Sequence, residues 1–298
     1  MSFASSGSLR RVASGLRADL RRGLWLGLLC ALCALCAAAC DDAPAERPRS
    51  FGGARPVTLQ APPTLEEGRE YPLVLVLHGY GANGFLQQAY FGLGDLATRG
   101  DALVLAPEGT LDAGGRQFWN ADPVCCDFGH LAPDDVGYLG GLVEDVADSW
   151  PVDPGAVFLV GHSNGAFMSY RLACERADLF AAIVGLAGNA ASVPCQPAEP
   201  VSILHVHGTA DDVVPYSGAV PSVTQWAGLD GCSGARTRGA DTDLEAGLTG
   251  AETRTEATAG CPAGVAVDLW SMEGAGHVPT FGATFPQVAW QWLLDHRR

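Results

Sequence analysis

A serine between two glycines is the residue of this chain best suited to nucleophilic chemistry. Ser163 is the centre of a Gly-His-Ser-Asn-Gly run over residues 161–165, after an apolar stretch (157–160) and before a helix-forming stretch (166–175). A strand, a Gly-x-Ser-x-Gly turn and a helix in this order make a sharp turn that exposes the serine hydroxyl. Side chains in place of the two glycines would collide with the neighbouring strand and helix, so we expect glycine to be required at both positions.

A serine hydroxyl is a weak nucleophile and needs a base, together with an acid that orients the base. Downstream of Ser163, Asp211 follows an apolar run at residues 203–206, and His277 lies in a Gly-rich loop after residues 265–271. Serine, acid and histidine in this chain order are typical of hydrolases with such a turn. We therefore predict Ser163 as nucleophile, His277 as base and Asp211 as orienting acid, with the adjacent Asp212 as the alternative acid.

Two more histidines, His205 and His207, alternate on the strand that leads to Asp211. We expect them to face opposite ways, with one of them packed near the site but not catalytic.

The negative oxygen that forms during attack on a carbonyl needs two hydrogen-bond donors. The backbone N–H of Asn164 opens a helix directly after the nucleophile, where it can point at this oxygen. The second predicted donor is the backbone N–H of Tyr80, in the His-Gly-Tyr-Gly run that follows the first strong strand.

A long Gly- and Pro-rich segment, residues 107–133, is a candidate substrate loop because simple connections are much shorter. Its aromatic residues Phe118 and Trp119 are predicted substrate contacts that could stack on a phenolic acyl group; the alternative is that they belong to the core.

Strands and helices alternate along the chain around these residues. Residues 73–77 are a continuous apolar run, typical of a strand buried on both faces of a parallel sheet. The alternation predicts a single-domain, doubly wound, mostly parallel sheet. With the turn at Ser163, it predicts the α/β-hydrolase fold. The other predicted strands are residues 102–106, 157–160, 181–186, 201–206 and 265–271, and the predicted helices are residues 85–99, 134–150 (capped by Asp134 or Asp135), 166–175 and 285–296.

The N-terminal region reads as an export signal. Five arginines precede an apolar stretch at residues 23–39, which is short for a membrane span and suits a signal peptide. Three alanines precede Cys40, as in a bacterial lipoprotein signal whose cysteine is lipidated. We expect a signal at residues 1–40, a Pro-, Ala- and Arg-rich tether at 41–56 and the folded domain at 57–298. The protein is then exported and either anchored to a membrane or freely secreted. Simple cleavage after Ala39 and an uncleaved anchor are the alternatives to lipidation.

The charge of the chain excludes several function classes. Residues 41–298 hold 13 basic and 32 acidic residues, a formal net charge of −19, which disfavours nucleic acid and anionic membranes as partners. All 18 basic residues are arginine, which excludes phosphate-binding loops with lysine, Schiff bases and serine–lysine dyads. We expect no metal and no cofactor.

Six cysteines follow residue 40, an even number that suggests disulfides in an exported protein. We predict a bond between Cys232 and Cys261, which flank an acidic loop rich in Gly, Thr and Ala. Cys125 and Cys126 are adjacent, so at most one of them easily reaches Cys174 or Cys195, and the remaining connectivity stays open.

Several sequence blocks together resemble one known family. The blocks are residues 77–84 (LHGYGANG), 118–120 (FWN), 125–127 (CCD), 134–138 (DDVGY), 161–166 (GHSNGA), 207–211 (HGTAD) and 276–277 (GH). They resemble the polyhydroxybutyrate depolymerase-like and feruloyl-esterase-like family of secreted α/β-hydrolases, over about residues 56–295. The resemblance implies a triad of Ser163, Asp211 and His277 that acts on esters.

The sequence thus predicts an exported serine carboxylesterase. Its expected substrates are small or polymeric esters of the feruloyl, acetyl or short hydroxyalkanoate type, and membrane contact is expected only through a lipid anchor at Cys40. The alternatives are a serine peptidase on the same fold and a noncatalytic surface-binding lipoprotein.

Overall fold

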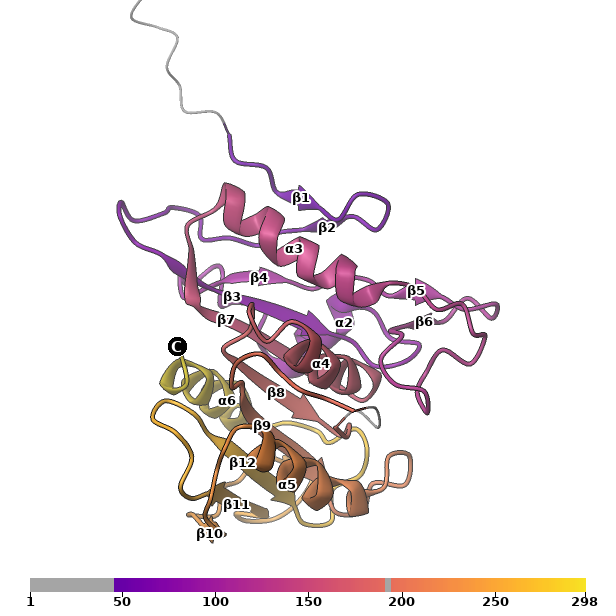
Figure 1. Cartoon of the computed structure of the whole chain (residues 1–298), viewed down its shortest axis with the longest axis vertical. Helices are drawn as coiled ribbons and strands as arrows, with labels where there is room; N and C mark the ends of the chain where they lie inside the picture. Colours follow the sequence, from indigo (N-terminus) through magenta and orange to yellow (C-terminus); the bar gives the residue numbers. More distant parts are fainter. Residues whose placement is uncertain (1–45, 191–193) are drawn as a thin grey trace, which may run out of the picture. The chain divides into compact units, whose positions relative to one another are not determined.

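An eight-stranded sheet runs through the centre of the structure, a computed structural model that describes residues 46–190 and 194–298 (Figure 1). Its strands, in spatial order, are β10 (Arg236–Arg238), β11 (Thr253–Thr258), β12 (Val267–Met272), β9 (Ser202–Gly208), β8 (Ala182–Leu186), β7 (Val152–His162), β3 (Tyr71–Leu77) and β4 (Leu103–Leu105). From β12 to β4 all neighbours are parallel, whereas β10 and β11 add an antiparallel edge. The predicted mostly parallel, doubly wound α/β-hydrolase sheet is confirmed.

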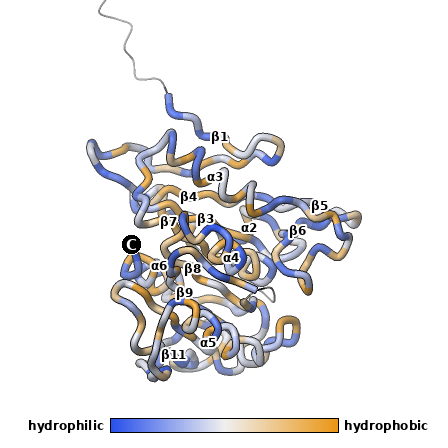
Figure 2. The backbone as a smooth tube through the Cα atoms, viewed as in Figure 1, coloured by the Kyte–Doolittle hydropathy of each residue, from blue (hydrophilic) through white to orange (hydrophobic). Residues whose placement is uncertain are grey.

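Two hydrophobic layers enclose the sheet because alternate residues of each strand point to opposite faces. On β3, Leu73, Leu75 and Leu77 join one buried cluster, and Val74 and Val76 join the other. Hydrophobic segments accordingly run along the central strands (Figure 2).

The helices divide between these two layers. Helices α3 (Asp135–Ser149), α4 (Asn164–Glu175) and α5 (Ala219–Leu229) contribute to the first cluster, and α2 (Gly84–Phe91) and α6 (Thr284–Asp295) contribute to the second. A 3-10 turn, η1 (Tyr216–Gly218), precedes α5, and two short hairpins pair β1 (Ser50–Phe51) with β2 (Val57–Thr58) and β5 (Thr110–Leu111) with β6 (Gln117–Phe118). In the described part of the chain, no helix has the length and apolar character that crossing a membrane requires.

Most predicted elements are present, but one helix is shorter than predicted, and α5, β10 and β11 were not predicted. The helix predicted over residues 85–99 ends at Phe91, because Gly92 adopts a left-handed conformation with φ of 66° and caps it. The strands β10 and β11 were not predicted, since Arg236–Arg238 and Thr253–Thr258 are polar, partly exposed strands without an apolar run.

The predicted tether, residues 41–56, is too long at its C-terminal end. Ser50–Phe51 pairs with β2, Phe51 is buried in the core, and Arg55 forms a 2.6 Å ion pair with buried Asp135. Packing against α3 therefore fixes this stretch, and the folded unit begins at Pro48 rather than at residue 57. The predicted signal and Cys40 lie outside the described residues.

Candidate active site

Ser163 lies at a sharp turn between β7 and α4. Its φ of 53° and ψ of −120° are unusual for a residue with a side chain, and they are held by the packing on both sides. A Cβ atom on Gly161 would lie 2.3 Å from the carbonyl oxygen of Gly165, and a Cβ on Gly165 would lie 2.2 Å from that of Leu77. The expectation that both glycines are required by close packing is confirmed.

A chain of hydrogen bonds joins the three predicted catalytic side chains. The Nε2 atom of His277 lies 2.9 Å from Oγ of Ser163, and Nδ1 of His277 lies 2.8 Å from Oδ2 of Asp211. These residues come from loops after β7, β9 and β12, which all end at the same edge of the parallel sheet. The arrangement can move a proton from the serine hydroxyl to an oriented imidazole.

The carboxylate of Asp211 is buried and well supplied with donors. Its Oδ1 atom accepts hydrogen bonds from the backbone N–H groups of Val213 and Val214, both at 2.9 Å. Burial opposes ionisation, but the hydrogen bonds from His277 and from these two N–H groups outweigh it and hold the pKa of Asp211 below its ordinary value. Asp212, the alternative acid, is exposed to solvent, and the histidine contacts Asp211.

The two predicted oxyanion donors belong to different segments, both near Ser163. Asn164 is the first residue of α4, so its N–H has no carbonyl within the helix to bind. The N–H groups of Gly79 and Gly81 donate to protein oxygens, whereas within residues 46–190 and 194–298 no acceptor is found for the N–H of Tyr80. Two free donors near the nucleophile suit a developing negative charge, and their role stays a prediction.

The side chain of Asn164 has a second task. Its Oδ1 atom accepts a hydrogen bond from the backbone N–H of Trp119 at 2.7 Å, and its amide nitrogen donates to the carbonyl of Trp119 at 2.9 Å. This paired contact ties the start of α4 to the β6 strand and so holds the turn at Ser163.

The prediction that Phe118 and Trp119 contact substrate is wrong. Both side chains are 0% exposed, and the indole N–H of Trp119 donates to the backbone carbonyl of His78 at 3.0 Å. The hairpin formed by β5 and β6 turns these aromatic rings into the core, which a sequence pattern alone does not reveal.

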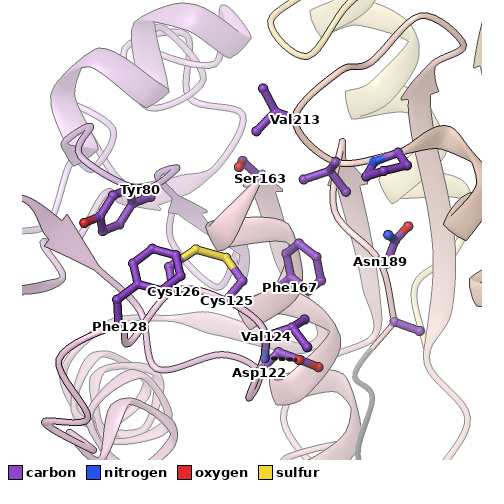
Figure 3. A pocket seen from close by; sticks show the side chains of 13 residues that line it. Tyr80, Asp122, Val124, Cys125, Cys126, Phe128, Ser163, Phe167, Asn189 and Val213 are labelled. Atoms are coloured by element: carbon purple, nitrogen blue, oxygen red, sulfur yellow. Dashed lines mark hydrogen bonds between the residues drawn. A yellow bond between two sulfur atoms is a disulfide. The ribbon is translucent and has the colours of Figure 1, made fainter.

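A pocket of about 480 Å³ opens beside Ser163. In Figure 3 the serine lies between a wall that carries Tyr80 and Phe128 and a wall that carries Phe167 and Asn189. The lining is mostly apolar, and it also includes Asp122, Val124, Cys125, Cys126, Ala190, Val213, Val214 and Pro215.

Part of this pocket was predicted and part was missed. The C-terminal half of the predicted substrate loop, residues 107–133, does contribute to the lining, but through Phe128 rather than through Phe118 and Trp119. Phe128 is 65% exposed, an unusual state for a phenylalanine, and its ring meets that of Tyr80 edge to face at 5.4 Å. Phe167 on α4 could have been found as the fourth residue after Ser163, one helical turn away.

The expectation that His205 and His207 face opposite ways is also wrong. Residues two apart on a strand point to the same face, because the side-chain period is 2. Their rings stack at 5.3 Å, and Nε2 of His205 lies 3.0 Å from Nδ1 of His207. Both are fully buried behind Asp211.

In the described part of the chain, three disulfides hold loops around the sheet. The predicted bond between Cys232 and Cys261 is present, and Cys174 bonds to Cys195. The adjacent Cys125 and Cys126 bond to each other, a pairing that the sequence did not predict. This third disulfide lines the pocket, and the Sγ atom of Cys125 lies 3.7 Å from the side-chain nitrogen of Asn164. Among the described residues, no cluster of three or more histidine, cysteine or acidic side chains is arranged to hold a metal ion.

Comparisons with known proteins agree with the geometry of the site. The chain is 32% identical over 184 residues to a protein named "Probable feruloyl esterase C" from Aspergillus niger, which covers 60% of this chain and 63% of that protein. It is 28% identical over 290 residues to feruloyl esterase D of Neurospora crassa, which covers 90% of this chain and 92% of that protein. No family model matches the chain.

Among solved structures, the acetyl xylan esterase from Aspergillus awamori matches with a TM-score of 0.61 at 16% identity, over 84% of this chain and 98% of that one. The chain spans only part of several curated relatives: 63% of the Aspergillus niger protein and 45% of feruloyl esterase B of Piromyces equi.

The fold is that of an α/β-hydrolase. Within this class the sequence is feruloyl-esterase-like, which confirms that part of the resemblance seen in its motifs. The resemblance to polyhydroxybutyrate depolymerases stays a prediction.

Proposed function

We propose that this protein is a serine carboxylesterase with Ser163 as its nucleophile. The observation that carries the proposal is the hydrogen-bonded chain from Asp211 through His277 to Ser163, whose hydroxyl lines an apolar pocket. Such a chain lets a neutral imidazole accept the hydroxyl proton while the carboxylate fixes its tautomer. The names of the relatives, which are feruloyl esterases, support ester bonds as the substrate.

In the proposed reaction, Oγ of Ser163 attacks the ester carbonyl and its proton passes to Nε2 of His277. The N–H groups of Tyr80 and Asn164 stabilise the negative oxygen of the tetrahedral intermediate. His277 then gives the proton to the leaving alcohol, which leaves an acyl group on Ser163. Water, deprotonated by His277, attacks this acyl group, and the acid is released as His277 returns the proton to Oγ of Ser163. Asp211 stabilises the imidazolium in both steps.

The pocket supports an ester with one apolar half. The rings of Phe128 and Phe167 and the Cys125–Cys126 disulfide offer apolar surface next to the nucleophile. Feruloyl-type and acetyl-type esters and short hydroxyalkanoate esters are the substrate classes that we propose.

We further propose that the protein is exported. The basic and apolar N-terminal sequence supports a signal at residues 1–40, and the three disulfides suit an oxidising compartment. Lipidation at Cys40 would tether the enzyme to a membrane, and cleavage without lipidation would release it. Mass spectrometry of the N-terminal peptide from cells that export the protein distinguishes the two.

The activity is tested with purified protein lacking residues 1–40, on a panel of aryl, acetyl, feruloyl and hydroxyalkanoate esters and a matched aryl amide. We expect ester hydrolysis that Ser163→Ala lowers by about 10⁴-fold or more in kcat, with Ser217→Ala, a change at an exposed serine, as the matched control. A fluorophosphonate probe should label Ser163. Labelling of another serine, or equal activity of Ser163→Ala, would overturn the proposal, and preference for the amide would indicate a peptidase.

A further inference from the structure

A buried row of polar side chains continues the hydrogen-bonded chain behind Asp211. The hydroxyl of Tyr170, on α4, lies 2.6 Å from Nδ1 of His205, and Nε2 of His205 lies 3.0 Å from Nδ1 of His207, both on β9. The Nε2 atom of His207 lies 2.9 Å from the carbonyl oxygen of Val214 and 3.2 Å from Oδ2 of Asp211. Tyr170, His205 and His207 are all 0% exposed, so solvent does not supply alternative partners.

The partners determine which ring nitrogen carries each proton. A carbonyl oxygen can only accept, so Nε2 of His207 carries hydrogen and its Nδ1 accepts. His205 therefore donates through Nε2 and accepts at Nδ1, and the hydroxyl of Tyr170 must be the donor to it. Each donor in the row thus points to the next member, and the N–H of His207 meets the carbonyl of Val214 beside Asp211.

Burial favours the neutral forms that this assignment needs. It lowers the pKa of His207 and lowers the pKa of His205 well below the ordinary value of histidine. It also raises the pKa of Tyr170, which keeps the phenol protonated. The row is thus a set of aligned neutral dipoles rather than a chain of charges.

His207, the last member of the row, lies against Oδ2 of Asp211, the oxygen that faces His277. The backbone N–H groups of Val213 and Val214 occupy Oδ1, whereas Oδ2 faces Nδ1 of His277 and Nε2 of His207. His207 also binds the carbonyl of Val214, so one ring holds both the carboxylate and the loop that carries it.

We propose that His207 is a positioning residue for Asp211, and that Tyr170 and His205 fix its donor tautomer. The inference rests on the proposed function, in which Asp211 orients the base. In this role the N–H of His207 limits rotation of the carboxylate and offsets part of its negative charge. Without it, Asp211 would attract a proton onto His277 more strongly, and activity would be lost at a higher pH on acidification.

Other groups also face this part of the site. The ring of Tyr216 meets His207 edge to face at 5.7 Å, and the ring of His162 lies 5.0 Å from that of His277. Each variant therefore has to be compared with wild type over the full pH range and not at one pH value.

The test uses the rate at which a fluorophosphonate probe labels Ser163, measured from pH 5 to 9, together with kcat and KM on the best ester. The variants are His207→Leu, which removes the donor, His207→Gln, which keeps an N–H donor, and Tyr170→Phe, which removes the first donor of the row without adding bulk. His296→Gln, directly after α6, is the matched control.

We expect His207→Leu to lower kcat about 10-fold to 100-fold with little change in KM, since a hydrogen bond to a charged group is lost. Its loss of labelling on acidification should move up by about 0.5 pH unit or more. His207→Gln should recover most of both effects, and Tyr170→Phe should show the same changes to a smaller extent.

One outcome contradicts the inference, and a different one contradicts the proposed function. If His207→Leu and Tyr170→Phe fold but keep the labelling rate and pH dependence of wild type, the row is structural only and the positioning role is wrong. If His207→Leu does not fold, Tyr170→Phe and His207→Gln still decide. Absence of labelling at Ser163 in the wild-type protein would instead contradict the proposed function.

Discussion

The Nε2 atom of His162 lies 2.9 Å from the backbone carbonyl oxygen of His277. The carbonyl can only accept, so the His162 ring donates this hydrogen bond. Burial lowers the pKa of His162 to about 4, which keeps the ring neutral near pH 7 and adds no positive charge beside His277. His162, the residue before Ser163, therefore fixes the backbone of His277.

Loss of this contact should slow catalysis. We expect His162→Leu to lower kcat about 10-fold, because a free carbonyl lets the loop of His277 move away from Ser163. His162→Gln keeps an N–H donor and should recover most of the activity. Steady-state kinetics on one ester decide the point, and a leucine variant as active as wild type would show that the contact is dispensable.

The two adjacent aspartates should differ sharply. Asp211→Asn is expected to lower kcat by about 10³- to 10⁴-fold, because an amide at Oδ2 cannot hold the imidazole in the required tautomer. Asp212→Asn, at the exposed neighbour, is the matched control and should change kcat little. Circular dichroism checks that both variants fold, and the reverse ranking would move the acid to Asp212.

The exposed ring of Phe128 should contribute to substrate binding. We expect Phe128→Ala to raise KM for aryl and feruloyl esters about 10-fold and for acetyl esters much less, because only the larger substrates lose contact with the ring. Phe85→Ala, which removes a ring that is also exposed but does not line the pocket, should leave both values unchanged. Equal effects on aryl and acetyl esters would argue against a role of Phe128 in selectivity.

The disulfide between Cys232 and Cys261 should stabilise the region that leads to His277. It joins residues 29 apart, and in a loop-entropy treatment the double variant Cys232→Ala/Cys261→Ala loses about 3–4 kcal/mol of the free energy of unfolding. Urea unfolding of the oxidised protein measures this loss. A double variant as stable as wild type would mean that the bond adds nothing to the free energy of unfolding.

Asp230 should make stability depend on pH. Burial raises its pKa from 3.8 to about 7, so between about pH 4 and 7 the folded protein binds a proton at this carboxyl that the unfolded chain releases. Stability from this group is therefore present at low pH and falls as the pH rises through this window. Asp230→Asn should remove this slope, on the order of 3 kcal/mol between pH 4 and 8.

Urea unfolding at several pH values measures the Asp230 effect, and Asp243→Asn, at an exposed aspartate, serves as the control. Parallel pH profiles of wild type and Asp230→Asn would contradict the expectation.

Local chemistry in the sequence was enough to predict the turn at Ser163 and the strand alternation. The turn depends on two glycines within two residues of the serine, and strands buried on both faces need continuous apolar runs such as β3. The meeting of Ser163, Asp211 and His277 could then be predicted, because the loops after parallel strands lie at one edge of the sheet. The pairing of Cys232 with Cys261 could likewise be predicted, because the two cysteines flank one acidic segment rich in Gly, Thr and Ala.

Only the tertiary structure decided which side chains line the pocket and which lie behind the site. Phe118 and Phe128 are the same residue type on the same loop, yet the hairpin of β5 and β6 buries the first and leaves the second exposed. The direction of a loop side chain depends on packing against distant segments, and no local pattern encodes it. The alignment of Tyr170 with His205 and His207 has the same origin, since Tyr170 on α4 reaches His205 on β9 only once the sheet has formed.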